Sequence, residues 1–136
     1  MSETALTIHV EVNPTEDSEK VKTAIKNLFV VTSIELRAQQ KGQLIVANGT
    51  GKEGLTKFYN LIRQERIIAA ARRVLSNGTS GKSVLLCLNK QAAYMNRISF
   101  CEPIGESPLG SIKIEIISDN PKALIDWLAP KLNRKY

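Results

Sequence analysis

The stretch of sequence most suggestive of chemistry spans residues 78–83 and reads GTSGKS. It is similar to the end of a phosphate-binding loop, G-x-x-x-x-G-K-[ST], in which backbone N–H groups hold the phosphates, the lysine reaches them and the hydroxyl binds magnesium. Gly81, Lys82 and Ser83 fit this pattern, but Ser76 stands where the first glycine belongs. The loop also has to run from a strand into a helix, because the helix N-terminus attracts the anion.

The elements predicted around this stretch run in the opposite order. Residues 52–76 predict one long helix, and residues 83–89 predict a continuous apolar strand that is covered on both faces. Asn77 and Gly78 lie between these two elements. Asn and Gly are typical of helix C-termini, where the chain enters the left-handed backbone region. A helix–loop–strand order does not support a nucleotide site, so we interpret Lys82 as an available cation near the end of the helix.

Residues suited to catalysis or metal binding are scarce. His9 is the single histidine, and the alternation of apolar residues over 4–12 places it on the polar side of a strand. Cys87 and Cys101 form no C-x-x-C motif and do not complete a zinc site with His9. We interpret both cysteines as reduced core thiols, with a disulfide as the alternative. We therefore predict a protein that is not an enzyme and needs no cofactor.

Positive charge is concentrated in the middle of the chain. The 136 residues include 19 Lys and Arg against 13 Asp and Glu, a net charge of +6. Residues 49–82 contribute seven basic and two acidic residues, whereas residues 1–48 have a net charge of −1 and residues 83–136 of +2. A concentrated basic segment favours a polyanionic partner such as nucleic acid, and a merely solvated basic face is the alternative.

Basic side chains of the long helix share one of its faces. At 100° per residue, Lys52, Arg63, Arg66 and Arg73 fall within an arc of about 80°, with Tyr59 among them. Lys and Arg bind phosphates, and amide side chains make polar contacts with RNA. We therefore predict these RNA-binding residues: Lys52, Arg63, Arg66, Arg73, Lys82, Asn89, Lys90, Gln91 and Arg97.

Two further features of the long helix are not part of this basic face. Arg72 falls on the apolar face, two turns after Glu65, and we interpret the two residues as an ion pair. Ile67, Ala71 and Val74 form a second apolar edge. A helix that is apolar on more than one side is covered on more than one side, which indicates a dimer contact.

The remaining elements complete an α+β pattern in one domain over residues 1–136. No apolar run reaches the ~18 residues that cross a membrane, and the N-terminus lacks the features of a signal peptide, so we expect a cytoplasmic protein. The predicted fold is an antiparallel or mixed sheet packed by one long basic helix and two shorter helices. Beyond the elements named above, we predict strands over 33–40, 43–49, 97–100 and 111–117. We also predict a helix over 13–29 that Asn13 or Thr15 caps, and a helix within 119–130 that buries Trp127. Residues 89–96 read as a polar connection, 106–110 as a turn and 131–136 as a basic tail.

Four sequence blocks carry a family resemblance. They are VNPTED after the first strand, RIIAAARRVL on the long helix, LCLNKQAAYMNRISF, and SPLGSIKIEI before the last helix. With these blocks the chain resembles an archaeal family of small uncharacterised proteins catalogued as an RNA-binding domain. LNKQAA and PLGSI are the most specific parts, and Ser111 stands where we expect proline.

This resemblance covers nearly the whole chain and has implications for fold and partners. It implies an α+β fold similar to the large-subunit ribosomal protein that binds 5S RNA, and it implies a homodimer. The first functional hypothesis is a non-catalytic protein that binds structured or ribosomal RNA. The alternative is an oligomerising or regulatory module for a protein partner such as a P-loop nucleotide kinase, because related modules occur joined to such proteins.

Overall fold

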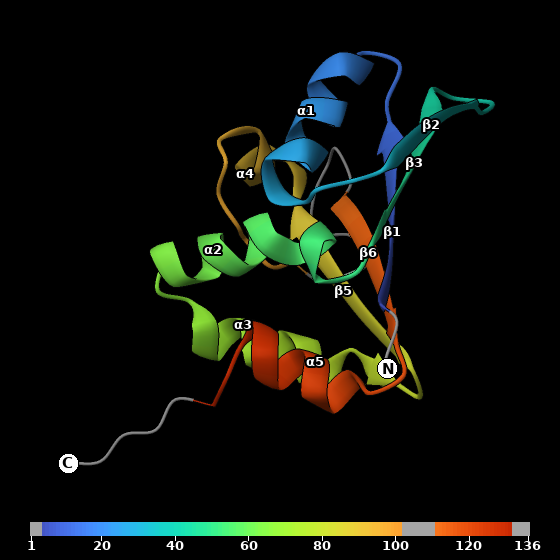
Figure 1. Cartoon of the computed structure of the whole chain (residues 1–136). Helices are drawn as coiled ribbons and strands as arrows, with labels where there is room; N and C mark the ends of the chain where they lie inside the picture. Colours follow the sequence, from blue (N-terminus) through green and yellow to red (C-terminus); the bar gives the residue numbers. More distant parts are fainter. Residues whose placement is uncertain (1–3, 102–110, 132–136) are drawn as a thin grey trace.

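An antiparallel sheet forms one layer of the molecule, and all the helices lie against one of its faces (Figure 1). The computed structural model describes residues 4–101 and 111–131. Six strands follow the order β2-β3-β1-β6-β5-β4, and every pairing in the described part is antiparallel. The elements are β1 (Thr4–Val12), α1 (Ser18–Leu28), β2 (Ser33–Ala38), β3 (Gln43–Thr50), η1 (Lys52–Leu55), α2 (Thr56–Gln64), α3 (Ile68–Asn77), β4 (Thr79–Ser80), β5 (Ser83–Asn89), α4 (Lys90–Tyr94), β6 (Ser111–Ser118) and α5 (Pro121–Leu128). The predicted α+β class is confirmed.

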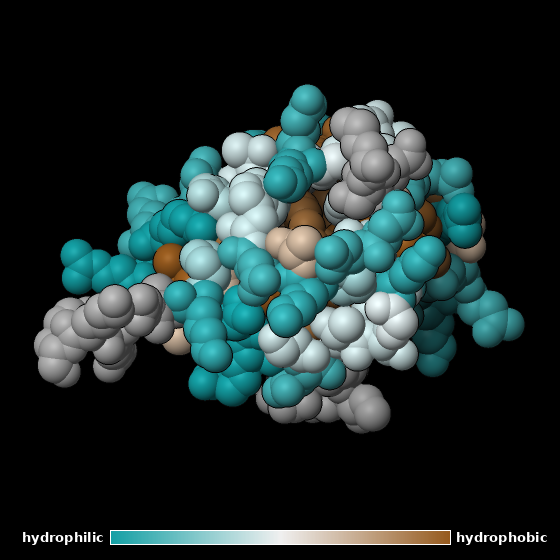
Figure 2. Space-filling view, turned by 60° about the horizontal axis from the view of Figure 1, so that its bottom comes forward, coloured by the Kyte–Doolittle hydropathy of each residue, from teal (hydrophilic) through white to brown (hydrophobic). Residues whose placement is uncertain are grey.

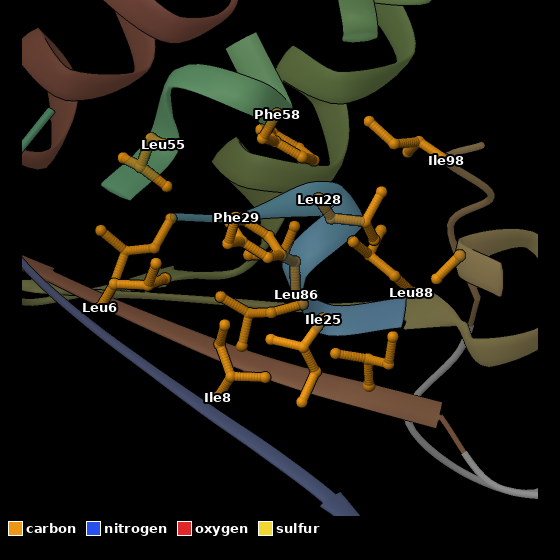
Figure 3. Close-up of a cluster of buried hydrophobic side chains, with 14 of the residues drawn as sticks. Leu6, Ile8, Ile25, Leu28, Phe29, Leu55, Phe58, Leu86, Leu88 and Ile98 are labelled. Carbon is orange, nitrogen blue, oxygen red and sulfur yellow. The ribbon is translucent and has the colours of Figure 1, made fainter. Parts of the chain in front are cut away.

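The core lies between the sheet and the helices. Strand side chains point alternately to the two faces, so Leu6 and Ile8 of β1 both point towards the helices and are at most 1% exposed. Figure 3 shows these side chains beneath Phe29 and Phe58. The two phenylalanine rings stack with their centroids 5.5 Å apart. This contact joins the end of α1 to α2.

The first helix begins later than its sequence predicts. Asn13 and Thr15 were its expected caps, but Asp17 is the N-cap and accepts a hydrogen bond from the Glu19 N–H at 2.9 Å. Asn13 instead donates its backbone N–H to the Glu16 carboxylate at 2.9 Å. This local turn occupies the residues that the longer helix would have used.

The predicted long helix over 52–76 is wrong, because the chain turns between α2 and α3. Arg66 has a φ of 60°, in the left-handed region. The Ile67 N–H donates to the Ile62 carbonyl at 2.9 Å and the Arg66 N–H donates to the Arg63 carbonyl at 3.1 Å. These two bonds form a Schellman motif, whose left-handed position is usually glycine. An arginine at this position gave no sequence signal of a helix end.

The apolar edge expected to form a dimer contact is covered within the chain. Ala71 is 0% exposed, and Ile67 and Val74 pack against the core. The turn before α3 explains the difference, because it directs this edge of α3 back onto the sheet. The prediction of a dimer contact on this helix edge is therefore wrong.

Residues 78–83 form a hairpin between β4 and β5, which confirms the helix–loop–strand order. Gly78 ends α3 with a φ of −88°, so it does not enter the left-handed region as predicted. A side chain at this position would place its Cβ 1.9 Å from the Leu85 carbonyl oxygen. Gly81, in the hairpin turn, has a φ of 59° and open space around it.

Three other expectations differ from the structure. We expected both faces of β5 to be covered, but Leu85 is 53% exposed because the helices lie on the opposite face. The polar connection after β5 contains α4, and the strand over 97–100 is reduced to a bridge between Leu88 and Phe100. The predicted turn at 106–110 lies outside the described residues, as does the basic tail predicted over 131–136 apart from Lys131. In the part of the chain that is described, no helix has the length and apolarity needed to cross a membrane.

We predict that Gly78→Ala destabilises the protein by about 1–3 kcal/mol, because the new methyl group overlaps the Leu85 carbonyl. Urea unfolding followed by circular dichroism measures this loss. Gly81→Asn is the matched control, since asparagine tolerates positive φ and meets no neighbouring atom there. Equal stability of Gly78→Ala and the wild type would contradict the close approach of these two segments.

Candidate nucleic-acid interface

Two of the predicted cations flank a pair of aromatic rings between α2 and α5. The rings of Tyr59 and Trp127 stack with centroids 4.8 Å apart. The Lys52 Nζ lies 4.9 Å from the centroid of the Trp127 ring, and the Arg63 Cζ lies 3.4 Å from that of Tyr59. Cations at these distances are attracted by the electron-rich faces of the rings. Trp127, which we expected only to be buried, thus helps to position Lys52.

Arg63 serves mainly to hold the C-terminal end of α5. Its Nη1 donates to the carbonyls of Tyr59 and Leu128, both at 3.0 Å, and its Nη2 donates to the Trp127 carbonyl at 3.4 Å. The last carbonyls of a helix have no partner within the helix and carry partial negative charge. The half-buried guanidinium is therefore used within the chain and is a poor candidate for a phosphate contact.

Arg72 reaches the same end of α5 from α3. It was expected to pair with Glu65, but its Nη1 lies 2.9 Å from the Asp126 carboxylate and donates to the Ala129 carbonyl at 3.1 Å. The turn between α2 and α3 removes the helical spacing on which the expected pair depended. Two arginines from two helices therefore bind the C-terminal end of α5.

Arg66 and Arg73 are the predicted cations whose side chains contribute least to holding the fold together. Both are exposed, Arg66 at the turn after α2 and Arg73 on the outer side of α3. Neither forms an ion pair or a side-chain hydrogen bond with any residue in ranges 4–101 and 111–131. Their guanidinium groups face solvent and are available for an anion.

Arg97 lies near Arg66, although the two are far apart in the sequence. The Glu65 carboxylate accepts the Ile98 N–H at 3.0 Å and lies 3.8 Å from the Arg97 Nε. Arg66 is the next residue after Glu65, so both arginines are at the C-terminal end of α2. The Arg97 side chain is 70% exposed despite this ion pair.

The other predicted contacts are more dispersed. Lys82 lies in the β4–β5 turn with its Nζ 3.7 Å from Asp119. Asn89 caps α4, because its Oδ1 accepts the Ala92 N–H at 2.9 Å. Gln91 is exposed on α4. The structure therefore does not gather all the predicted residues into one continuous surface.

The prediction that Lys90 contacts RNA is wrong, because this residue is 0% exposed. Its Nζ donates to the Glu11 carbonyl at 2.7 Å and lies 3.0 Å from a Glu16 carboxylate oxygen. Tyr94 donates its hydroxyl to the same carboxylate at 3.2 Å. Lys90 begins α4, which packs against α1, whereas the sequence predicts only a polar connection here.

Opposing influences act on the ionisation of this buried cluster. Burial tends to raise the pKa of Glu16, but hydrogen bonds from Asn13, Lys90 and Tyr94 together with the Lys90 charge lower it below the ordinary value of 4.5. Burial and the neighbouring Glu16 charge raise the pKa of Tyr94 to about 12. The carboxylate form of Glu16 and the neutral form of Tyr94 are thus favoured by the fold.

Charge differs between the two sides of the molecule. The outward positions of the sheet carry acids and bases in similar numbers: Glu11, Glu35, Glu115, Arg37, Lys113 and His9. The helical side carries the basic segment, and hydrophilic side chains cover most of the face formed by α3 and α5 (Figure 2). The excess of positive charge therefore lies on the helical side.

A concave site that the sequence did not indicate lies on the open face of the sheet. It has a volume of about 300 Å³, and residues of β1, β5 and β6 line it, among them His9, Leu85 and Lys113. His9 is exposed there, as predicted. Within the described ranges no three His, Cys, Asp or Glu residues are arranged to hold a metal ion.

Comparisons with known proteins agree on one family. Residues 5–117 match a family model described as RNA binding. A UPF0201 protein of Sulfurisphaera tokodaii is 43% identical over 128 residues, 94% of this chain and 88% of the relative. One of Methanopyrus kandleri is 42% identical over 140 residues, 96% of this chain and 86% of the relative. The crystal structure of a UPF0201 protein from Methanococcus jannaschii superposes with a TM-score of 0.83 at 28% identity, covering 95% of each chain.

We predict that Arg63→Ala and Arg72→Ala each destabilise the protein by about 1–3 kcal/mol, because the α5 carbonyls lose charged hydrogen-bond donors. Arg63→Lys recovers little of the loss, since an ammonium group cannot reproduce the planar guanidinium contacts. Arg73→Ala is the control and changes stability by less than about 0.5 kcal/mol. Chemical denaturation measures all four; equal effects of the three alanine variants would refute the role of the α5 contacts.

We predict that acid weakens the fold through Glu16. Because its pKa is lower in the folded chain, its contribution is complete above about 4.5 and is lost as the pH falls through the folded value. Glu16→Gln removes this pH dependence and costs about 3–5 kcal/mol at neutral pH, since the Lys90 ammonium loses its buried partner. Urea unfolding from about pH 7 to about pH 3 tests this. Glu19→Gln, which alters a surface pair with Lys22, should retain the wild-type profile.

Proposed function

Because the chain belongs to the UPF0201 family and matches an RNA-binding family model over residues 5–117, we propose that it is a non-catalytic RNA-binding protein. It recognises structured or ribosomal RNA through the cations of its helical side. The observation that carries this proposal is the separation of charge, with the basic excess on the helices and a balanced open face on the sheet.

The proposed contact surface, here called the helical basic surface, consists of Lys52, Arg66 and Arg73 with Lys82 and Arg97 at its margins. Lys52, Arg66 and Arg73 are exposed and have no acidic partner in the residues that the structure describes. Lys82 is held by a single exposed ion pair with Asp119, with the two side chains 70% and 59% exposed. Exposed ion pairs contribute little to stability, so Lys82 can exchange its carboxylate for a phosphate at small cost.

Arg97 is held more firmly than Lys82, because its partner Glu65 has a side chain that is only 16% exposed. Its own side chain is 70% exposed, which leaves part of the guanidinium for a second anion. Gln91 supplies a polar contact from α4. Arg63 and Lys90 support the surface from within the fold, and Asn89 does so as a helix cap.

Three finer expectations accompany this proposal and stay predictions. They are a likeness to the ribosomal protein that binds 5S RNA, a homodimer, and a cytoplasmic location. The first bears on the substrate, since double-stranded parts of a folded RNA are recognised mostly by shape and by contacts to phosphates and 2′-hydroxyls. The helical basic surface suits this mode of binding, because cations on short rigid helices make phosphate contacts without reading bases.

A second candidate function is docking of a protein partner, such as a nucleotide kinase, on the open face of the sheet. Leu85 and Ile117 are 53% and 42% exposed on this face, beside the concave site. Exposed apolar residues next to a concavity are typical of protein-binding surfaces. Pull-down from a lysate with and without ribonuclease separates the candidates, because a protein partner remains after RNA is removed.

We predict that the double variant Arg66→Gly/Arg73→Ala binds a labelled structured RNA hairpin about tenfold more weakly at about 0.1 M salt. The slope of log affinity against log salt should fall by about 1.5, because two phosphate contacts are lost. Glycine is chosen at position 66 because it relieves the left-handed backbone, so the variant does not lose binding through unfolding. Fluorescence anisotropy at several salt concentrations measures both quantities.

The control for this experiment is Lys41→Ala/Lys113→Ala, which removes the same charge from exposed positions away from the helices. It should retain most of the affinity and nearly the whole slope, apart from a small general charge effect. If the two double variants behave alike, binding follows net charge and the helical basic surface is not the site. If the wild type does not bind RNA at low salt, the proposed function is wrong.

A further inference from the structure

Four side chains form one continuous stack at the junction of η1, α2 and α5, in the order Lys52, Trp127, Tyr59 and Arg63. The two rings lie 4.8 Å apart between centroids, at an interplanar angle of 25°. Non-bonded atoms in contact are about 3.5–4.0 Å apart, so an ammonium group does not fit between rings at this separation. The Lys52 Nζ, 4.9 Å from the Trp127 centroid, therefore lies on the face of that ring turned away from Tyr59.

The two ends of this stack are held in different ways. At one end, the half-buried Arg63 guanidinium donates to three backbone carbonyls at 3.0, 3.0 and 3.4 Å. At the other end, the exposed Lys52 makes no ion pair and no side-chain hydrogen bond with any residue that the structure describes. An ammonium group over a ring at an exposed site is only weakly attracted. The outer face of Trp127 is therefore closed by a cation that can move away at little cost.

The Trp127 ring is held in place by the fold. It lies in the last turn of α5, and the next residue, Leu128, is 0% exposed. Tyr59 supports the ring from behind, and Arg63 donates to the carbonyl of Trp127. A ligand that binds a side chain already held in position does not have to supply the free energy of ordering it. The half-buried ring is therefore a preformed flat surface.

The chemistry of this end of the stack suits a nucleotide. A nucleobase stacks on an aromatic side chain, and the adjoining phosphate attracts an ammonium group. The Asp126 carboxylate, next to Trp127 in the chain, lies 2.9 Å from the Arg72 Nη1 and is already paired. Lys52 would repel a cationic ligand and would gain no contact from a purely apolar one. Both faces of a base inside a duplex are covered by its neighbours, so only an unpaired base can stack on the ring.

We propose that the outer face of Trp127 stacks against one unpaired base of a bound RNA, while Lys52 moves from the ring to the phosphate of that nucleotide. This inference rests on the proposed RNA-binding function and adds a substrate class to it, a folded RNA with an unpaired nucleotide in a loop or bulge. Stacking accepts any base, because every base has a flat aromatic face. The site therefore selects an unpaired nucleotide without selecting a sequence.

Two RNA hairpins with equal numbers of phosphates test this site, one with a single bulged adenosine and one with an abasic bulge. The wild type should bind the bulged adenosine about five- to tenfold more tightly, because only this RNA offers a base to stack. Trp127→Leu should bring this ratio to about one and leave the salt slope unchanged, since no charge is lost. Lys52→Ala should retain the ratio but reduce the slope by about 0.7, since one phosphate contact is lost. A merely structural role of Trp127 would weaken binding of both RNAs equally.

A measurement on the wild type decides the question even if Trp127→Leu does not fold. The protons of the bulged adenine should shift upfield in the NMR spectrum of the complex, because they lie over an aromatic ring. Trp127→Phe, which keeps a ring, should retain part of the affinity ratio. Equal affinity of the wild type for both hairpins, or unshifted adenine protons, would overturn the stacking site and leave RNA binding by the helical basic surface intact. A wild type that binds neither hairpin would overturn the proposed function and the stacking site together.

Discussion

The turn between α2 and α3 is the constraint on which the helical layer depends. It is formed by a left-handed Arg66 and held by the Glu65 carboxylate, which accepts the Ile98 N–H at 3.0 Å. Because the chain reverses there, α2 and α3 approach α5 from different directions, and Arg63 and Arg72 both reach the C-terminal carbonyls of α5. A single straight helix would bring only one of these arginines to that point. The same turn leaves Arg66 exposed at a corner of the surface.

The basic residues of this protein divide into two groups with different physical roles. Arg63, Arg72 and Lys90 have hydrogen bonds within the chain, to helix carbonyls or to buried oxygens. Moving such a group to a ligand would leave buried acceptors without donors, which costs more than a surface contact returns. Arg66 and Arg73 make no such hydrogen bonds to the residues that the structure describes. A high net charge therefore overstates the number of cations that a nucleic acid can use, and the usable ones lie on the helical side.

Patterns in the sequence predict most of the strands and the order of the elements. Only some of the RNA-binding residues that they predict belong to the helical basic surface. Alternating residues such as Leu6 and Ile8 predict the strands, and the order of helix, loop and strand excludes a phosphate loop at Lys82. The helix break could not be predicted, because arginine stands where glycine usually marks such a turn. The burial of Lys90 depends on Glu16, 74 positions earlier, and no local pattern reports so distant a pairing. The position of Arg63 on a helix face predicts an RNA contact, but the position of α5 decides that its guanidinium binds carbonyls of the chain instead.

The stacking of Tyr59 and Trp127 has a consequence for how the helical layer can be observed. Trp127 is the single tryptophan of the sequence, and its ring centroid lies 4.8 Å from that of Tyr59 and 4.9 Å from the Lys52 Nζ. Tryptophan fluorescence therefore reports on the place where α2, α5 and one cation of the helical basic surface meet. A polyanion that draws Lys52 away from this ring would change the emission while the chain stays folded.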